Sequence, residues 1–182
     1  AASDVYKRQG VFNVVTGDGP STGAPLVSHP LVNKVSFTGS TEVGKLIGHA
    51  CMDNMTRITL ELGGKSPVIV LDDCDPATAA AGAANAIFFN HGQVCCAGSR
   101  LYVHKKMFDR VVADVADHAS QLTLGHGLDP SAQMGPLVSQ EQMERVCGYI
   151  DIGRSQGAEV LVGGGRAGQR GYFVQPTVMT GV

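Results

Sequence analysis

The segment Lys34–Lys45, with the sequence KVSFTGSTEVGK, decides the fold class that we expect for this chain. Its first part, Lys34–Thr38, has the β-branched and aromatic composition of a buried strand. The strand runs directly into Gly-Ser-Thr, beginning at Gly39, which predicts a loop that opens a helix reaching about Cys51. A helix start behind a strand offers free N–H groups and the positive end of a dipole, which suits a phosphate. An ordinary turn with a Ser or Thr cap has the same pattern, so the motif alone leaves both interpretations open.

The alternation of strand and helix continues on both sides of this segment. Runs rich in Val, Ile, Thr and aromatic residues predict strands, and longer Ala-rich or periodic runs predict helices. Asp75 precedes Pro76 and is expected to cap a helix. This alternation is typical of the α/β class, which we therefore predict. The predicted strands are Val11–Val15, Lys34–Thr38, Thr56–Leu62, Val68–Leu71, Leu101–His104, Glu159–Val162 and Tyr172–Val178, the further helices are Asp75–Asn90, Lys106–Leu122 and Gln140–Gln156, and the loops are Thr16–Pro25 and Gly125–Val138.

Two adjacent glycines, Gly63 and Gly64, mark the predicted domain boundary. Residues 10–63 would belong to one domain and residues 64–182 to the other. Residues 1–9 are polar and share no periodic pattern with the rest of the chain, so we set them apart from both domains.

Composition excludes several classes of function. Of the 182 residues 16% are charged, the net charge is −2, and there is no basic run, so we expect no nucleic-acid partner. No apolar stretch is long enough to cross a membrane, and the N-terminus lacks the pattern of a signal peptide. The five cysteines are odd in number and form no Cys-x-x-Cys pair, which favours a reducing, cytoplasmic compartment over disulfides or a zinc site. His91 and Cys95 are four residues apart, but without a third ligand we expect no metal.

The segment Leu60–Pro67, LELGGKSP, places one charged residue at the end of an apolar strand. A carboxylate among apolar neighbours has a raised pKa and can serve as a base, and Glu61 is the candidate. A glutamate at a strand edge that faces solvent would give the same pattern.

The segment Asn90–Arg100, NHGQVCCAGSR, carries adjacent cysteines beside glycines. A thiol exposed on a glycine-flanked turn is a good nucleophile, and a position at a helix start would favour its thiolate. Two buried, inert cysteines are the alternative.

Together the three motifs resemble the aldehyde dehydrogenase superfamily. The family's Phe-Thr-Gly-Ser-x-x-x-Gly pattern matches Phe37–Gly44, its Glu-Leu-Gly-Gly-Lys box matches Glu61–Lys65, and its Gly-Gln-x-Cys box matches Gly92–Cys95. The match is collinear from about Gly10 to the end of the chain. It is similar to the hydrolytic NAD(P)-dependent branch that includes phenylacetaldehyde and betaine aldehyde dehydrogenases.

The resemblance implies an aldehyde dehydrogenase-like fold, with part of a Rossmann-like cofactor domain before Gly64 and part of an α/β catalytic domain after it. Cys95, at the fourth position of its box, would be the nucleophile, and Glu61 the base that activates water. NAD or NADP would be the cofactor and a small aldehyde the substrate, in a homo-dimer or homo-tetramer. The residues implied to contact the cofactor are Gly19, Gly39, Ser40, Gly44, Leu62 and Gln142.

Two alternatives stay open. A CoA-acylating member of the family would not need Glu61, because CoA rather than water would resolve the thioester. The chain is also much shorter than family members and lacks upstream and downstream segments of the cofactor site. We therefore expect no catalysis from these 182 residues alone, and a non-catalytic fragment is the second alternative.

Overall fold

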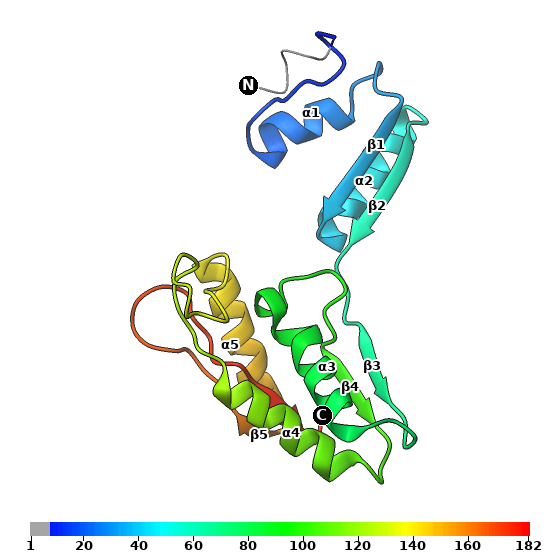
Figure 1. Ribbon diagram of the computed structural model, residues 1–182. Coiled ribbons are helices and arrows are strands. Elements are labelled where there is room, and N and C mark those ends of the chain that lie inside the picture. The colour runs from blue at the N-terminus through cyan, green and yellow to red at the C-terminus, as the bar shows by residue number, and fades with distance from the viewer. Residues whose placement is uncertain (1–7) are drawn as a thin grey trace. The chain divides into compact units, whose positions relative to one another are not determined.

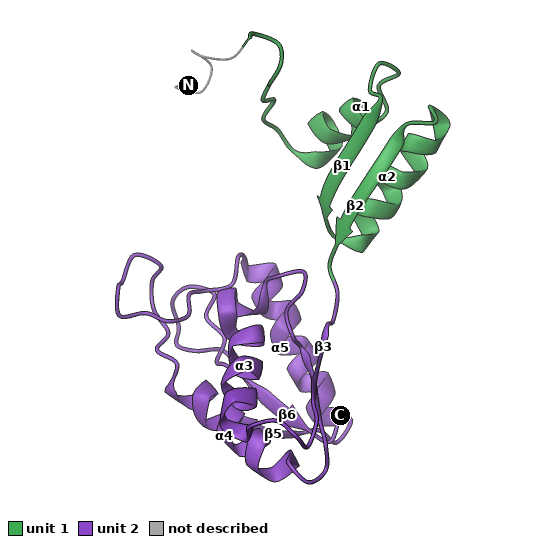
Figure 2. Ribbon diagram, turned by 45° about the vertical axis from the view of Figure 1, so that its right-hand side comes forward, with its two compact units in different colours: residues 1–63 green, residues 64–182 purple. Residues whose placement is uncertain are grey.

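The computed structural model describes residues 8–182, which form two compact units (Figure 2). The first unit ends at Gly63 and the second runs from Gly64 to Val182, so the division falls at the predicted boundary. The assignment of the two parts to a cofactor domain and a catalytic domain stays a prediction. Most of the 1–9 segment lies outside the described residues.

The first unit is built on a strand–helix–strand motif (Figure 1). Strand β1 (Lys34–Gly39) and strand β2 (Arg57–Leu62) pair in parallel, and helix α2 (Thr41–Asp53) connects them. A π-helical turn, η1 (Gly19–Gly23), and the short α1 (Ala24–Val27) precede β1. Both predicted strands and the helix between them are confirmed.

The two faces of the β1–β2 pair differ in character, because side chains alternate along a strand. Phe37 and Leu60 belong to the half-buried apolar face, and Leu62 on this face contacts α2. The opposite face is polar and exposed, and Glu61 lies on it beside Thr38.

Two predictions before β1 are wrong. Val11–Val15 forms no strand and its valines are exposed, since no described strand pairs with it to complete a ladder. Part of the predicted loop Thr16–Pro25 is helical, because Asp18 caps η1 and Pro20 lies in its first turn.

The second unit begins with another strand–helix–strand motif. Strands β3 (Pro67–Val70) and β4 (Arg100–Val103) are parallel, with α3 (Pro76–Phe88) between them. Asp75 caps α3 as predicted, accepting hydrogen bonds from the backbone N–H and the hydroxyl of Thr78 at 2.8 Å. A short 3-10 turn, η2 (Phe89–Gly92), ends the helix.

Helices α4 (Phe108–Gln121) and α5 (Gln140–Ser155) follow, and an antiparallel pair, β5 (Glu159–Val162) and β6 (Val178–Thr180), closes the chain. These elements were predicted except that β6 starts six residues later than the predicted strand. It begins after Pro176, whose nitrogen carries no hydrogen for a ladder bond.

Two apolar clusters hold the second unit together. The first joins α3, α4 and β3 around Val111, which is fully buried. The second packs α5 and the segment before it around Val174, with Leu137, Met143 and Ile150. The first cluster fixes the helix that leads to Cys95, and the second fixes the helix that carries Gln142.

Candidate active site

Five of the predicted site residues lie at one edge of the first unit. The carboxyl ends of β1 and β2 meet there, with Gly39 in register with Leu62 and Thr38 in register with Glu61. The next residue after β1, Ser40, begins α2. The carboxyl edge of a parallel sheet is where α/β proteins bind ligands.

Ser40 is the N-cap of α2. Its Oγ accepts a hydrogen bond from the backbone N–H of Val43 at 3.2 Å, and its carbonyl accepts one from Gly44 at 2.9 Å. The N–H groups of Thr41 and Glu42 have no acceptor within the helix, because helix geometry provides none in the first turn. The Ser40 hydroxyl can still donate its proton. These donors fit a phosphate group, although Glu42 places a negative charge in the same turn.

The two glycines of this motif also have packing roles. A Cβ on Gly39 would overlap the ring of Phe37, and one on Gly44 would lie 2.7 Å from Cδ2 of Leu62. Gly44 is buried, so α2 approaches β2 closely where this residue has no side chain. Close helix–strand packing is a known use of a glycine in such motifs.

The first unit does not give Glu61 the apolar surroundings expected from the sequence. Leu60 and Leu62 flank it in the chain but point to the opposite face, because side chains alternate along β2. Glu61 is exposed on the polar face. Its carboxylate is thus accessible to a water molecule.

Gly19, predicted to lie near the adenosine end of the cofactor, begins η1. Asp18 caps this turn through hydrogen bonds from the N–H and hydroxyl of Ser21, both at 2.7 Å, and these bonds lower the pKa of Asp18. Gly19 has open space around its Cα.

In the second unit, Cys95 lies in a turn between η2 and β4, with its side chain exposed. The turn is closed by a hydrogen bond from Ala97 N–H to the Val94 carbonyl at 3.0 Å. No helix starts at Cys95, so the expected support of its thiolate by a helix dipole is wrong. Cys96 is exposed as well, and the expected alternative of two buried cysteines is also wrong.

The residues just before this turn have an unusual backbone. Asn90, His91 and Gly92 have φ angles of 48°, 60° and 71°, all in the left-handed region. Such angles are costly for residues with a Cβ. At Gly92 a Cβ would also lie 3.1 Å from the carbonyl oxygen of Ile87.

Gln142 occupies the first turn of α5, where Ser139 is the N-cap and accepts from the Gln142 N–H at 3.2 Å. Gln142 lines a cavity of about 740 Å³ together with His91 and Arg145. The Nε2 atom of His91 is buried and has no hydrogen-bond partner among the described residues. Burial lowers the pKa of His91, so its ring is neutral at neutral pH.

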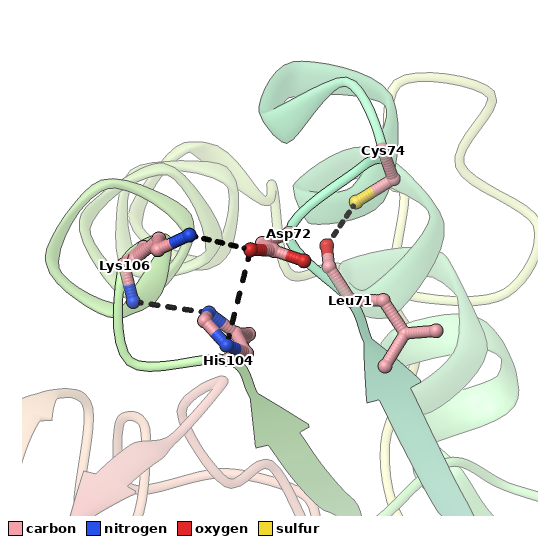
Figure 3. Close-up of polar contacts among 5 residues, drawn as sticks. All are labelled: Leu71, Asp72, Cys74, His104 and Lys106. Atoms are coloured by element: carbon pink, nitrogen blue, oxygen red, sulfur yellow. Dashed lines mark hydrogen bonds and ion pairs between the residues drawn. The ribbon is translucent and has the colours of Figure 1, made fainter.

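A second group of titratable residues lies at the carboxyl ends of β3 and β4 (Figure 3). Asp72 accepts a hydrogen bond from Nζ of Lys106 at 2.9 Å and lies 3.9 Å from Nε2 of His104. The lysine contact, and then the histidine, lower the pKa of Asp72. The Cys74 thiol donates a hydrogen bond to the Leu71 carbonyl. These exposed pairs link the loops that follow β3 and β4.

Within residues 8–182, no three His, Cys, Asp or Glu residues are grouped so as to hold a metal ion. In the same part of the chain, no helix combines the length and apolar character needed to cross a membrane.

Sequence analysis missed two features of the site. One is Gln93, whose Oε1 accepts a hydrogen bond from the N–H of Val138 at 3.0 Å. The other is Gly64, where a Cβ would lie 3.4 Å from the Cys95 carbonyl oxygen. Gln93 and Gly64 both belong to motifs quoted above. Their presence in those motifs was the feature of the sequence that could have pointed to them.

Comparison with known proteins identifies relatives with the same fold. Phenylacetaldehyde dehydrogenase from Pseudomonas fluorescens is 53% identical over 170 residues, which are 93% of this chain and 34% of that protein. The solved NAD+ complex of aldehyde dehydrogenase from Bacillus cereus is 49% identical with a TM-score of 0.89, covering 91% of this chain and 34% of that one. The solved NAD+ complex of betaine aldehyde dehydrogenase from Staphylococcus aureus is 38% identical with a TM-score of 0.94. That match covers 99% of this chain and 37% of the other.

The chain thus spans about a third of the length of the curated relatives that it matches. The sequence model described as the aldehyde dehydrogenase family matches residues 3–182, a range that begins inside the 1–9 segment set apart above. Because this match covers nearly the whole chain, and the mixed α/β structure agrees with solved members, the chain belongs to the aldehyde dehydrogenase family.

Proposed function

We propose that the full-length protein oxidises an aldehyde to a carboxylic acid with NAD or NADP, with Cys95 as nucleophile and Glu61 as general base. The observation that carries the proposal is the exposed Cys95 thiol on a hydrogen-bonded turn, at the position of the family's Gly-Gln-x-Cys cysteine. Thiols in such turns are accessible to an electrophilic carbonyl carbon.

In the first step, the Cys95 thiolate attacks the aldehyde carbonyl carbon. A C–S bond forms and the carbonyl π electrons move to oxygen, giving a thiohemiacetal oxyanion. The backbone N–H of Cys95 is the donor that this chain can offer to that oxygen. The nicotinamide cofactor, when bound, supplies the acceptor for the hydride that leaves the former aldehyde carbon. As the hydride leaves, the oxyanion electrons re-form the C=O bond, so that Cys95 is left carrying a thioester.

In the second step, Glu61 takes a proton from water, and the water oxygen attacks the thioester carbon on Cys95. The C–S bond breaks, the carboxylic acid leaves, the thiolate is regenerated, and Glu61 gives its proton to solvent. Exposure of Glu61 on the polar face of the β1–β2 pair is consistent with this role, since a general base must reach a water molecule. Retention of a carboxylate at this position favours hydrolysis over transfer to CoA.

The cofactor contacts are part of the proposal. The first turn of α2, with Ser40 and its free N–H groups, would hold the pyrophosphate beside Gly39, Gly44 and Leu62. Gly19 would border the adenosine end, and Gln142 the ribose next to nicotinamide. The relatives solved with NAD+ favour NAD over NADP. Assembly as a homo-dimer or homo-tetramer, and a reducing cytoplasmic compartment that keeps Cys95 a thiol, complete the proposal.

The neighbouring cysteines provide the test. In the full-length protein, with NAD and phenylacetaldehyde or another small aldehyde, Cys95→Ala should lower turnover by orders of magnitude, because the covalent step is lost. Cys96→Ala is the matched control, since both side chains are exposed on the same turn. It should retain most of the activity, because the proposed nucleophile is still present. Equal losses, or a loss only in Cys96→Ala, would show that the assignment of the nucleophile is wrong.

A further inference from the structure

Gln93 links the turn that carries Cys95 to the segment that leads into α5. Its Oε1 accepts a hydrogen bond from the backbone N–H of Val138 at 3.0 Å, from 45 positions further along the chain. Val138 is followed directly by Ser139, the N-cap of α5, and Gln142 lies in the first turn of that helix. One side chain therefore joins the nucleophile's turn to the helix that carries a proposed cofactor contact.

The main chain and side chain of Gln93 are themselves fixed by Asn90. The Gln93 backbone N–H and Nε2 donate to the Asn90 carbonyl at 3.0 and 3.4 Å, and the Asn90 Nδ2 donates to the Gln93 carbonyl at 3.2 Å. Asn90 and His91 have left-handed backbones, which persist only where the surrounding contacts hold them. The half-buried Gln93 thus lies in a segment whose conformation depends on such contacts.

We infer that Gln93 is a positioning residue for the proposed oxidation. It holds the Cys95 turn in register with the N-terminus of α5, so that the thiol and the groups near the nicotinamide side of the cofactor keep a fixed spacing. Gln93 acts through the Val138 bond and through the turn, and the role in the reaction rests on the proposed function. Misplacement of reacting groups by about 1 Å can slow a reaction by a factor of roughly a hundred.

The same unit offers a matched control. The Oε1 of Gln133 also accepts a backbone hydrogen bond at 3.0 Å, from the N–H of Thr123. That bond spans ten positions within the loop that follows α4, and neither Thr123 nor Gln133 carries one of the roles assigned above. Gln93→Met and Gln133→Met each remove one such acceptor with little change in side-chain length.

The experiment compares both variants with the wild type in the full-length protein. Hydrogen exchange should speed up by about tenfold at the Val138 amide in Gln93→Met, and at the Thr123 amide in Gln133→Met. The melting temperature should fall by a similar amount in both. Only Gln93→Met should lower kcat, by about tenfold to a hundredfold, with little change in the KM of the aldehyde. A purely structural role would lower kcat equally in both variants or in neither, which would overturn the inference.

A conservative variant adds a rescue arm. Gln93→Glu keeps a side-chain oxygen acceptor and should preserve slow exchange at Val138, whereas loss of protection equal to that in Gln93→Met would overturn the proposed bond. If Gln93→Met does not fold, hydrogen exchange in the wild type still tests the proposed bond. Fast, unprotected exchange at the Val138 amide of the wild type would overturn that bond. An inactive wild type would contradict the proposed function but not the bond, while full activity in Gln93→Met with fast Val138 exchange would contradict the positioning role alone.

Discussion

Gly98 lies directly against Val68, so that the chain leaving the Cys95 turn contacts strand β3 without a side chain between them. A Cβ built on Gly98 would fall 2.5 Å from Cγ2 of Val68 and 3.2 Å from the Cβ of Ala86 in α3. The Gly98 N–H also donates to the Ala86 carbonyl at 3.0 Å. The glycine therefore allows the turn to be anchored to both elements of the strand–helix–strand motif.

This contact predicts opposite effects for the same substitution at two glycines. Gly98→Ala should lower the free energy of unfolding by about 1–3 kcal/mol, because the added methyl group overpacks a buried site and a β-branched neighbour cannot easily rotate away. Gly82→Ala, at an exposed position in α3 with open space around it, should raise that free energy by up to about 1 kcal/mol. Urea denaturation of the two variants measures both effects.

The contact between the added methyl group at position 98 and Val68 can be tested with a double variant. Val68→Ala removes Cγ2, so Gly98→Ala should cost less in that background than in the wild type, giving a coupling free energy of at least about 0.5 kcal/mol. Strictly additive effects, or stabilisation by Gly98→Ala alone, would show that Gly98 and Val68 are not in contact.

Replacement of Glu61 tests the second chemical step. Glu61→Gln keeps the size of the side chain but removes the base, so deacylation of Cys95 should slow by a factor of about 10²–10⁴ in the full-length protein. Reduced cofactor should appear as a burst followed by slow turnover, and mass spectrometry should detect the acyl group on Cys95. Glu159→Gln, at an exposed strand position in β5, should leave turnover unchanged. Unchanged steady-state turnover in Glu61→Gln, with no acyl adduct, would exclude Glu61 as the base.

The fold could be predicted from the sequence wherever local signals and packing agreed. Asp75 before Pro76 marks the start of α3, and the same pair of signals predicts its cap. Val11–Val15 has equally strong strand composition but forms no strand, because a strand also needs a neighbouring strand to pair with, and local composition does not report one. The predicted strand Tyr172–Val178 is wrong for a reason that the sequence itself contains. Pro176 interrupts it, and this proline could have been used to place the start of the strand later.

The sequence names candidate site residues, whose roles stay predictions, but it does not predict their surroundings. The motif match proposes Cys95 and Glu61, yet the turn at Cys95 depends on the left-handed backbones of Asn90 and His91. Asn and His adopt this region more often than most residues, but that tendency is too weak to predict two consecutive left-handed residues. The exposure of Glu61 follows from strand alternation, which a pattern of neighbours along the chain does not reveal.

The cap of α3 predicts a component of acid sensitivity. Hydrogen bonds from the backbone and side chain of Thr78 lower the pKa of Asp75 below its ordinary value of 3.8. A lowered pKa in the folded state means that ionised Asp75 stabilises the fold above pH 3.8, and that this contribution is lost as the pH falls through 3.8 towards the folded-state value. Asp75→Asn keeps an acceptor for the Thr78 N–H but does not titrate.

Stability near neutral pH should therefore be nearly the same in Asp75→Asn and the wild type, while the loss of stability below pH 3.8 should be smaller in the variant. Urea midpoints across the acid range measure the difference. Asp129 has a pKa lowered by hydrogen bonds from Ser131 and still titrates in both proteins, so only part of the acid dependence should disappear. Parallel acid limbs for variant and wild type would contradict the cap contribution.

Gly92 should resist replacement for two separate reasons. Its φ of 71° is unfavourable for any residue with a Cβ, and an added Cβ would lie 3.1 Å from the Ile87 carbonyl oxygen, which belongs to the α3 backbone and cannot rotate away. Gly92→Ala should lower the free energy of unfolding by roughly 1–3 kcal/mol and, by shifting the turn, lower kcat in the full-length protein. Gly127→Ala, with ordinary φ and nothing within 4 Å, is the control and should change neither quantity. Denaturant midpoints and steady-state kinetics test both effects, and a Gly92→Ala enzyme that matches Gly127→Ala in stability and kcat would mean that the left-handed turn is not needed to present Cys95.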